Sequence, residues 1–451
     1  MYQNNKKEEA KYFLAYNINT LGGIITNYTL TESLEITSEN FNPKEITFKN
    51  CKFYGELYIK NISCNKIKFI DCEFEQRVII KNSHIDKLVF LKCKFNHYFG
   101  FNTLHSKEIT FKNNQLQLSK ELVIDQFYTE SLFFTRNISS HNVKIIPMKI
   151  SMCTLEGSTS QIQLSISQRN RETKIKTFNL NYANDINTDI LIRHLKINQF
   201  HLFGEINNST LSVTDVSIAT SILSLFTNRG NVSFGEIKPL NEQNNIIIKD
   251  SSLGDMIVSN INFELFNRIL VKNSNMLDLI PININWCKNN ISDVTKNELK
   301  ENYRQLKLVN FKNGDTPSKL HFEKLEYETY YEILKEKKGN WTDKFILFLS
   351  SWSNNFGQDF SLAFNWIIVL SIILYTLIKY QLGHTSFNHN LILGEIGSFI
   401  NFLNPTHNVE KVFFLEKNYQ GNIVLFDGVG KIINAYLIFQ LISSFRKYSK
   451  K

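Results

Sequence analysis

The chain has 451 residues, enough for two or three domains, and a moderately basic net charge of +9. Its six cysteines form no CxxC pair and no Cys/His cluster at zinc-ligand spacing, so we predict no metal site and no cofactor. The sequence motifs of dinucleotide, phosphate-loop, metalloprotease and serine-hydrolase sites do not occur, and the sequence therefore predicts a protein that is not an enzyme.

Residues 1–24 are predicted to form an N-terminal cap. They contain no apolar stretch of the signal-peptide type. We therefore expect most of the chain to stay in the cytoplasm, where thiols remain reduced.

A 21-residue repeat follows this segment. The stretch ITFKNCKF at residues 46–53 returns as IKFIDCEF at 67–74 and LVFLKCKF at 88–95, and a fourth copy, ITFKNNQL at 109–116, has lost its cysteine. Apolar and polar residues alternate within each copy, which is the period of a β-strand. The aligned copies share an aromatic column and a cysteine column: Phe48, Phe69, Phe90 and Phe111, and Cys51, Cys72 and Cys93.

Self-similarity at a fixed period near 20 residues is typical of a solenoid. We predict a mainly β protein in which residues 25–285 form a right-handed parallel β-helix with coils of 21–23 residues. Equivalent side chains would stack as ladders, with each cysteine as a small apolar filler, and disulfides between coils are the alternative. The stretch IIKDSSL at 247–253 returns 23 residues later as LVKNSNM, whereas residues 148–245 are the least regular.

Residues 294–340 lose the strand alternation and are predicted to form a helical linker. Good helix formers fill residues 297–311 and 317–338, and the intervening NGDTP favours a turn. The apolar run in residues 341–359 is too short to cross a bilayer. Its Trp and Phe side chains favour an interfacial helix, and a helix packed on the solenoid is the alternative.

Two apolar stretches predict transmembrane helices at residues 361–382 and 423–445, with a buried core helix as the alternative to the first. The loop between them, residues 383–422, has only two basic residues, whereas KEKK precedes the first span and the basic tail 446–451 follows the second. The positive-inside rule therefore predicts a two-pass protein of the inner (cytoplasmic) membrane, with both termini cytoplasmic and an extracytoplasmic loop.

Four polar positions interrupt the second span: Asp427, Lys431, Asn434 and Gln440. The first two are four residues apart, so their charges neutralise each other on a helix. The two amides are costly against lipid and usually face another helix. They predict either packing between the two spans of one chain or a polar face in a homo-oligomer that lines a pore.

The linker contains a YRxLK segment, an acidic turn and an FxxxE segment: Tyr303, Arg304, Leu306, Lys307, Asp315, Phe322 and Glu326. With the two spans, this pattern resembles bacterial pentapeptide-repeat and β-helix membrane proteins that end in an ion-channel-like tail. The resemblance covers residues 303–451 and implies an architecture rather than an activity. The repeats are not clean pentapeptides, and the outer loop lacks a TVGYG-like potassium filter.

Polar clusters elsewhere are interpreted as solvated surface. Basic and acidic residues interleave along the repeats, so no nucleic acid is expected as a partner. We interpret the carboxylates Asp71, Glu73 and Glu75 as part of a solvated face where a strand meets a turn. His384, His389 and His407 are interpreted as exposed loop residues, with a shared metal as the alternative.

These features predict a membrane-anchored β-helix scaffold or sensor that binds the lipid bilayer and holds a protein partner at its inner face. The runner-up is an oligomeric two-span ion channel or membrane-permeabilising effector gated by the solenoid. A β-helix carbohydrate enzyme is a weaker third hypothesis.

Overall fold

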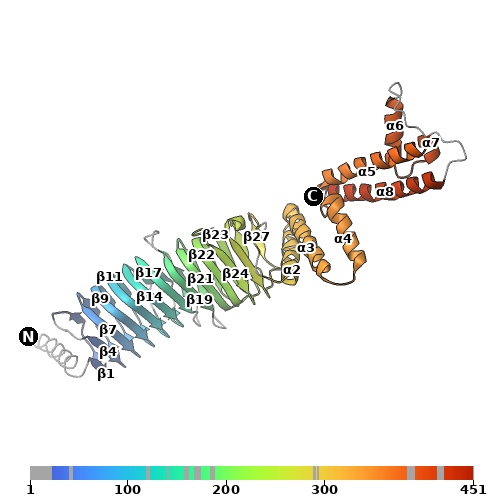
Figure 1. Ribbon diagram of the computed structural model, residues 1–451. Coiled ribbons are helices and arrows are strands. Elements are labelled where there is room, and N and C mark those ends of the chain that lie inside the picture. Colours follow the sequence, from blue (N-terminus) through green and yellow to red (C-terminus); the bar gives the residue numbers. More distant parts are fainter. Residues whose placement is uncertain are drawn as a thin grey trace, which may run out of the picture. The chain divides into compact units, whose positions relative to one another are not determined.

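A computed structural model describes most of the chain. The described residues are 23–39, 44–117, 122–139, 142–156, 162–166, 174–182, 188–287, 291, 294–382, 392–413 and 421–449. The chain divides into two compact units, Met1–Val294 and Thr295–Lys451. The first unit is built from strands and the second from helices (Figure 1). Nearly all of the predicted cap, residues 1–24, lies outside the described residues.

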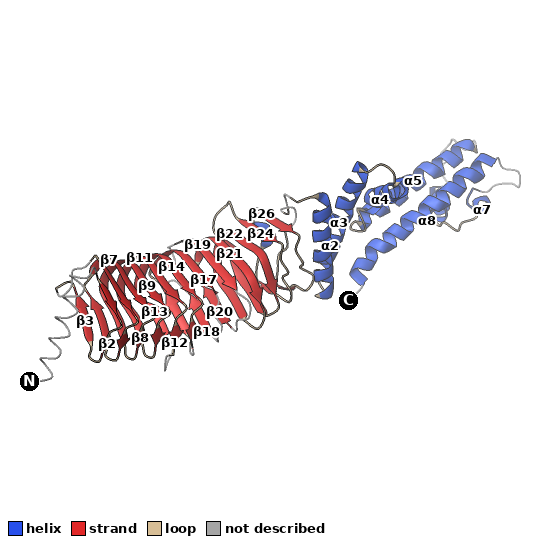
Figure 2. Cartoon of the chain, turned by 90° about the horizontal axis from the view of Figure 1, so that it is seen from below, coloured by secondary structure: helices blue, strands red, loops and turns tan. Residues whose placement is uncertain are grey.

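The first unit is a parallel β-solenoid of about 11 turns, with its strands stacked in succession (Figure 2). A narrow six-stranded sheet contains β2 (Thr29–Leu30), β5 (Lys52–Phe53), β8 (Glu73–Phe74), β10 (Lys94–Phe95), β12 (Gln115–Leu116) and β15 (Ile138–Ser139).

A second sheet has 21 strands. Its N-terminal strands are β1 (Ile24–Thr26), β3 (Leu34–Thr37), β4 (Glu45–Lys49), β6 (Leu57–Lys60), β7 (Ser63–Ile70), β9 (Val78–Leu91), β11 (Phe99–Lys112), β13 (Leu122–Asp125), β14 (Phe127–Thr135), β16 (Val143–Ile146) and β17 (Lys149–Glu156). Its remaining strands are β18 (Ile162–Ile166), β19 (Ile175–Tyr182), β20 (Thr188–Arg193), β21 (Lys196–Ile206), β22 (Thr210–Asn228), β23 (Asn231–Pro239), β24 (Asn245–Lys249), β25 (Ile257–Ser259), β26 (Arg268–Lys272) and β27 (Ile280–Ile282). A 3-10 turn, η1 (Phe263–Leu265), lies between β25 and β26.

The strand register follows the sequence repeat. Phe90 on β9 pairs with Phe69 on β7 and with Phe111 on β11. The later repeat is paired in the same way, because Ile247 on β24 lies opposite Leu270 on β26. The predicted parallel solenoid is therefore confirmed. Its coils lengthen in the irregular middle, where Thr154 pairs with Asn179, 25 residues later.

Each coil turns at residues with a positive φ angle. In the repeats these are Asn50, Asp71, Lys92 and Asn113, each directly before the cysteine column or its asparagine replacement. Asn and Asp tolerate this left-handed conformation better than other non-glycine residues because their short polar side chains hydrogen-bond locally. Many asparagines of the chain therefore occupy corners of the solenoid, which contains little glycine.

The second unit contains seven described helices: α2 (Lys296–Lys312), α3 (Thr316–Glu336), α4 (Trp341–Asn354), α5 (Phe360–Gln381), α6 (Ile392–Leu403), α7 (Val409–Phe413) and α8 (Gly421–Ser449). The first two form the predicted linker. Thr295 and Glu298 make a capping box at the start of α2, and the Asp315 side chain caps α3 by accepting from the Ser318 amide.

Two helices, Phe360–Gln381 in α5 and Gly421–Phe445 in α8, are long and apolar enough to cross a membrane. The segment between them differs from the predicted loop, because it contains α6 and α7. Helix α6 has only 12 residues, too few to cross a bilayer, so apolar length alone does not predict it. Both helices pack against α5 and α8 in one apolar cluster that includes Tyr375, Phe402 and Phe413.

Candidate functional site

The predicted aromatic ladder lies inside the solenoid. Consecutive rings of Phe48, Phe69, Phe90 and Phe111 stack at centroid distances of 5.0, 5.0 and 5.1 Å. A second column, Phe53, Phe74 and Phe95, stacks at 4.9 Å and meets the first column edge-on. All seven rings are buried. These residues therefore hold the coils together and offer no surface for a ligand.

The cysteine column is buried beside the corners, and all six cysteines of the chain are free thiols. Cys72 donates to the carbonyl of Phe48 through its Sγ, at 3.4 Å. In the fourth copy Asn114 replaces the cysteine, and its Nδ2 donates to the carbonyl of Phe90 at 3.1 Å. Its Oδ1 accepts from the Cys93 amide at 2.7 Å. The column is thus a set of internal corner supports, and no disulfides join the coils.

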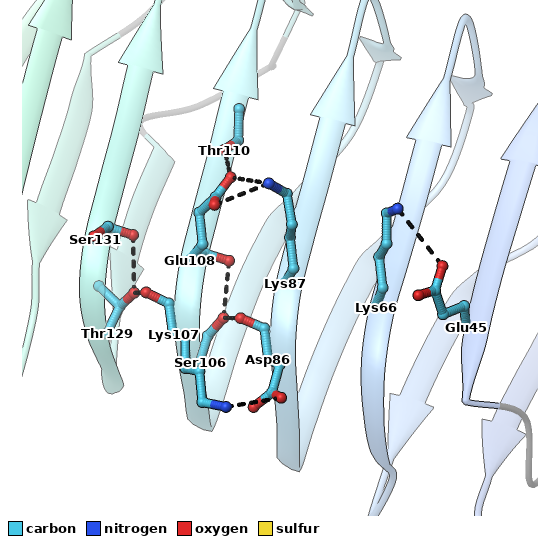
Figure 3. Close-up of polar contacts among 10 residues, drawn as sticks. All are labelled: Glu45, Lys66, Asp86, Lys87, Ser106, Lys107, Glu108, Thr110, Thr129 and Ser131. Carbon is cyan, nitrogen blue, oxygen red and sulfur yellow. Dashed lines mark hydrogen bonds and ion pairs between the residues drawn. The ribbon is translucent and has the colours of Figure 1, made fainter.

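Charged side chains on the outer surface pair between neighbouring coils (Figure 3). Lys66 lies 3.6 Å from Glu45, Lys87 lies 2.8 Å from Glu108, and Lys107 lies 3.0 Å from Asp86. Each pair joins coils that are adjacent in the stack, so the interleaved charges follow the ladder geometry.

The carboxylate of Glu73 is paired with lysines of neighbouring coils in the same way. Lys94 and Lys52 each contact the Glu73 carboxylate at 3.0 Å, and both hold its pKa below the usual range. A general acid needs a raised pKa, so Glu73 lacks the property that such a role requires.

The YRxLK segment and the FxxxE segment meet across the α2–α3 hairpin. The rings of Tyr303 and Phe322 stack at 6.3 Å, and Leu306 is buried beside them. Lys307 forms a 2.7 Å ion pair with Glu326 that is mostly shielded from solvent. Arg304 instead pairs with Glu301 on its own helix, and Asp315 caps α3. The motif residues therefore fix the geometry of a helical hairpin.

The two amides of the second span contact partners within the chain. Asn434 on α8 accepts a 2.9 Å hydrogen bond from Ser371 on α5, and its Nδ2 lies 3.5 Å from the carbonyl of Phe402 on α6. Gln440 accepts a 2.6 Å bond from Asn354 at the end of α4. Sequence reasoning missed Ser371 and Asn354, although Ser371 is a hydroxyl in the middle of an otherwise apolar span.

Asp427 lies in a buried ionic cluster. Its carboxylate is 2.6 Å from His407 Nε2 and 2.7 Å from Lys431 Nζ. The other ring nitrogen, Nδ1, lies 2.7 Å from the carbonyl of Asn404. The interpretation of His407 as an exposed loop residue is therefore wrong, because its side chain is only 3% exposed. His384 and His389 lie outside the described residues.

Among the residues that the structure describes, no group of three or more His, Cys, Asp or Glu side chains is placed to hold a metal ion. Comparison with protein-family models, curated proteins and solved structures finds no match to this chain.

Proposed function

We propose that this protein is a two-pass scaffold or sensor of the cytoplasmic membrane, anchored by α5 and α8, whose solenoid binds a protein partner at the inner face. The observation that carries this proposal is the distribution of side chains on the two apolar helices. The polar side chains Ser371, Asp427, Lys431, Asn434 and Gln440 contact one another or a neighbouring helix of the same chain. The outward faces of the two helices are mostly apolar.

The outward faces suit lipid. Large exposed apolar side chains on α5 include Phe360, Phe364, Val369, Ile372, Ile373 and Leu377, and those on α8 are Val424, Leu425, Val429, Ile432, Phe439, Ile442 and Phe445. Exposed to water, so much contiguous apolar surface is unfavourable for a soluble protein. Facing acyl chains, it has no such cost, and the backbone groups are satisfied within the helices.

The charge distribution supports the orientation in the proposal. The basic stretch KEKK precedes α4, and the basic residues of the tail 446–451 lie at the C-terminal end of α8 and directly after it. Anionic headgroups of the cytoplasmic leaflet attract such segments. Helix α4, with Trp341 74% exposed, lies between the basic stretch and α5, where an interfacial helix is expected.

A partner-binding role for the solenoid is supported by its form. Stacked coils make an extended, rigid surface of the kind that repeat proteins use to bind partners. The described part of the chain holds no cluster of metal-ligating side chains, and the Glu73 carboxylate is paired with Lys52 and Lys94. Binding is therefore the use that the surface supports best.

Membrane flotation tests the anchor. The full chain should float with phosphatidylcholine and phosphatidylglycerol vesicles and resist extraction at alkaline pH. A chain that stops at residue 340 should stay in the soluble fraction. Flotation of the shorter chain to the same extent, or alkaline release of the full chain, would contradict the proposal.

An ion channel is the second candidate function, because α8 carries buried polar groups along its length. A pore requires Asn434 and Gln440 to face water in an oligomer, whereas both have partners within one chain. Ion flux from vesicles that contain the full chain separates the two functions. Flux that is lost in Asn434→Leu/Gln440→Leu would favour the channel, and inserted protein without flux favours the scaffold.

A further inference from the structure

The segment between the two apolar helices is itself apolar. Its helix α6, ILGEIGSFINFL, contains one charged residue, Glu395, and is followed by a turn and by α7. The ends of α5 and α8 that this segment connects, Gln381 and Gly421, are called the joined ends. Contacts of α6 and α7 with the two long helices show how far the segment descends from these ends.

The first turn of α6 lies close to the joined ends. The carboxylate of Glu395 contacts the ammonium group of Lys379 and accepts a 3.1 Å hydrogen bond from the Tyr375 hydroxyl. Lys379 is two residues from the end of α5, about 3 Å along a helix that rises 1.5 Å per residue. The only charge of α6 is therefore neutralised near the surface level of the span.

The last turn of α6 lies much deeper. The carbonyl of Phe402 is 3.5 Å from Nδ2 of Asn434, which also accepts from Ser371. Ser371 is about 15 Å from the joined end of α5, and Asn434 is about 20 Å from that of α8. Since a hydrocarbon core is about 30 Å thick, both positions are near its middle.

The chain then returns toward the joined ends. His407 contacts Asp427, which is about 10 Å nearer to the joined end of α8 than Asn434. The ring of Phe413 on α7 packs 5.2 Å from that of Tyr375. The turn between the helices satisfies several of its own backbone groups, because Asn404 accepts from the amides of Thr406 and His407, and Asn408 accepts from that of Glu410. Non-helical backbone at membrane depth requires such internal partners.

One face of α6 is left exposed by the residues that the structure describes. Leu393, Ile396 and Ile400 follow helical spacing and are 86%, 49% and 59% exposed. The opposite face packs Phe399 and Phe402 against Tyr375. At the depth set by the contacts above, the outward face meets the hydrocarbon region of the bilayer.

We infer that residues 392–413 form a re-entrant hairpin: α6 descends from the joined ends to the middle of the bilayer, and α7 returns, with Leu393, Ile396 and Ile400 against lipid acyl chains. The inference rests on the proposed insertion of α5 and α8 and goes beyond it, because it makes the predicted outer loop part of the membrane domain.

Depth-dependent quenching tests the hairpin. An environment-sensitive fluorophore is attached to one added cysteine in the full chain, in phosphatidylcholine vesicles. The lipids carry a spin label either at acyl carbon 12 or on the headgroup. The six native cysteines are buried, so unmodified protein measures the background labelling. Ile400→Cys and Ile396→Cys probe α6, and Ile372→Cys and Tyr380→Cys are the deep and shallow references on α5.

The ratio of deep to shallow quenching at Ile400→Cys should match that at Ile372→Cys, and Ile396→Cys should fall between the two references. A ratio at Ile400→Cys equal to that at Tyr380→Cys, or fast labelling of Ile400→Cys by a membrane-impermeant maleimide, would overturn the hairpin alone. If Ile372→Cys is not quenched by the deep label, α5 does not insert, and both the proposed function and the hairpin fail.

Discussion

The cysteine column shows how one residue position serves the whole solenoid. The thiols of Cys51 and Cys72 fit the space behind their corners and donate weakly to a carbonyl of the preceding coil. Where Asn114 and then Asn137 take the position, amide groups make the same kind of contact at 3.1 and 3.0 Å. The substitution is tolerated because a buried amide is stable only when its hydrogen bonds are made, and the corner carbonyls supply them.

At the residue scale we expect Phe69→Ala to lower the unfolding midpoint of the solenoid strongly. The ring lies between Phe48 and Phe90 and is completely buried, so its removal leaves a cavity that costs about 3–5 kcal/mol. Urea unfolding followed by circular dichroism measures the shift. Tyr54→Ala, at an exposed ring, is the control, and an equal shift for the two variants would refute the stacking argument.

Thiol reactivity is a second residue-scale prediction. Burial raises the pKa of Cys64 to about 11 and that of Cys287 to about 12, so little reactive thiolate exists at pH 8. Labelling of the native chain with a maleimide should be slow and should rise sharply in denaturant. Rapid modification of all six thiols in the folded protein would contradict the buried column.

At the scale of elements, the helices are positioned by caps and by a few polar contacts. Helix α2 begins at a capping box, and the α2–α3 hairpin is closed by the Lys307–Glu326 pair. In the α5–α8 pair, one hydrogen bond between Ser371 and Asn434 lies in an apolar interface. Few other polar contacts lie near each of these. We therefore expect the loss of one contact to destabilise only the helix or helix pair that it joins.

Thr295→Ala should loosen the first turn of α2. The variant removes the acceptor for the Glu298 amide, and loss of an N-cap costs about 1 kcal/mol. Hydrogen exchange of the first-turn amides should become faster, while the exchange of α3 amides stays unchanged. Thr342→Ala, within α4, is the matched control and should leave exchange in α2 as it was.

Asn434→Leu should destabilise the α5–α8 pair by about 1 kcal/mol, the scale of an interhelical hydrogen bond in a membrane protein. It leaves the Ser371 hydroxyl without this acceptor. Thermal unfolding in detergent micelles measures the loss. Ile432→Leu, at an exposed position of α8, should be neutral, and equal stability of both variants would show that the bond is not formed.

At the scale of the whole molecule, the solenoid is a one-dimensional stack. Each coil pairs with the coil before it and the coil after it, so its stability is close to a sum of neighbour contributions. Coil length fixes which side chains face inward, because a strand alternates between its two faces with every residue. Deletion of a fraction of a coil therefore moves apolar residues to the surface, whereas deletion of a whole coil keeps them inside.

Deletion of residues 67–87, one complete 21-residue coil, should leave a folded solenoid with a modestly lower unfolding midpoint. The junction places Phe90 opposite Phe48 and keeps every ladder in register. Deletion of residues 67–77, about half a coil, should give aggregation or loss of the β-sheet signal. Similar solubility and circular dichroism for the two deletions would refute the register argument.

The periodic parts of the fold can be predicted from the sequence. The columns of Phe69 and Cys72 place equivalent residues on adjacent coils, because a parallel stack repeats one local environment at a fixed step. The linker helices and the two long apolar helices are likewise visible, since caps and hydrophobic length are local properties. Local sequence is therefore sufficient to predict these elements and the order in which they occur.

Contacts between residues far apart in the sequence cannot be predicted in this way and are seen only in the folded chain. Nothing local pairs His407 with Asp427, Ser371 with Asn434 or Asn354 with Gln440, because each contact depends on how separate helices pack. The 12-residue apolar helix α6 is ambiguous for the same reason. Its length excludes a span, and only its contacts with Lys379 and Asn434 show how deep it reaches between the ends of α5 and α8.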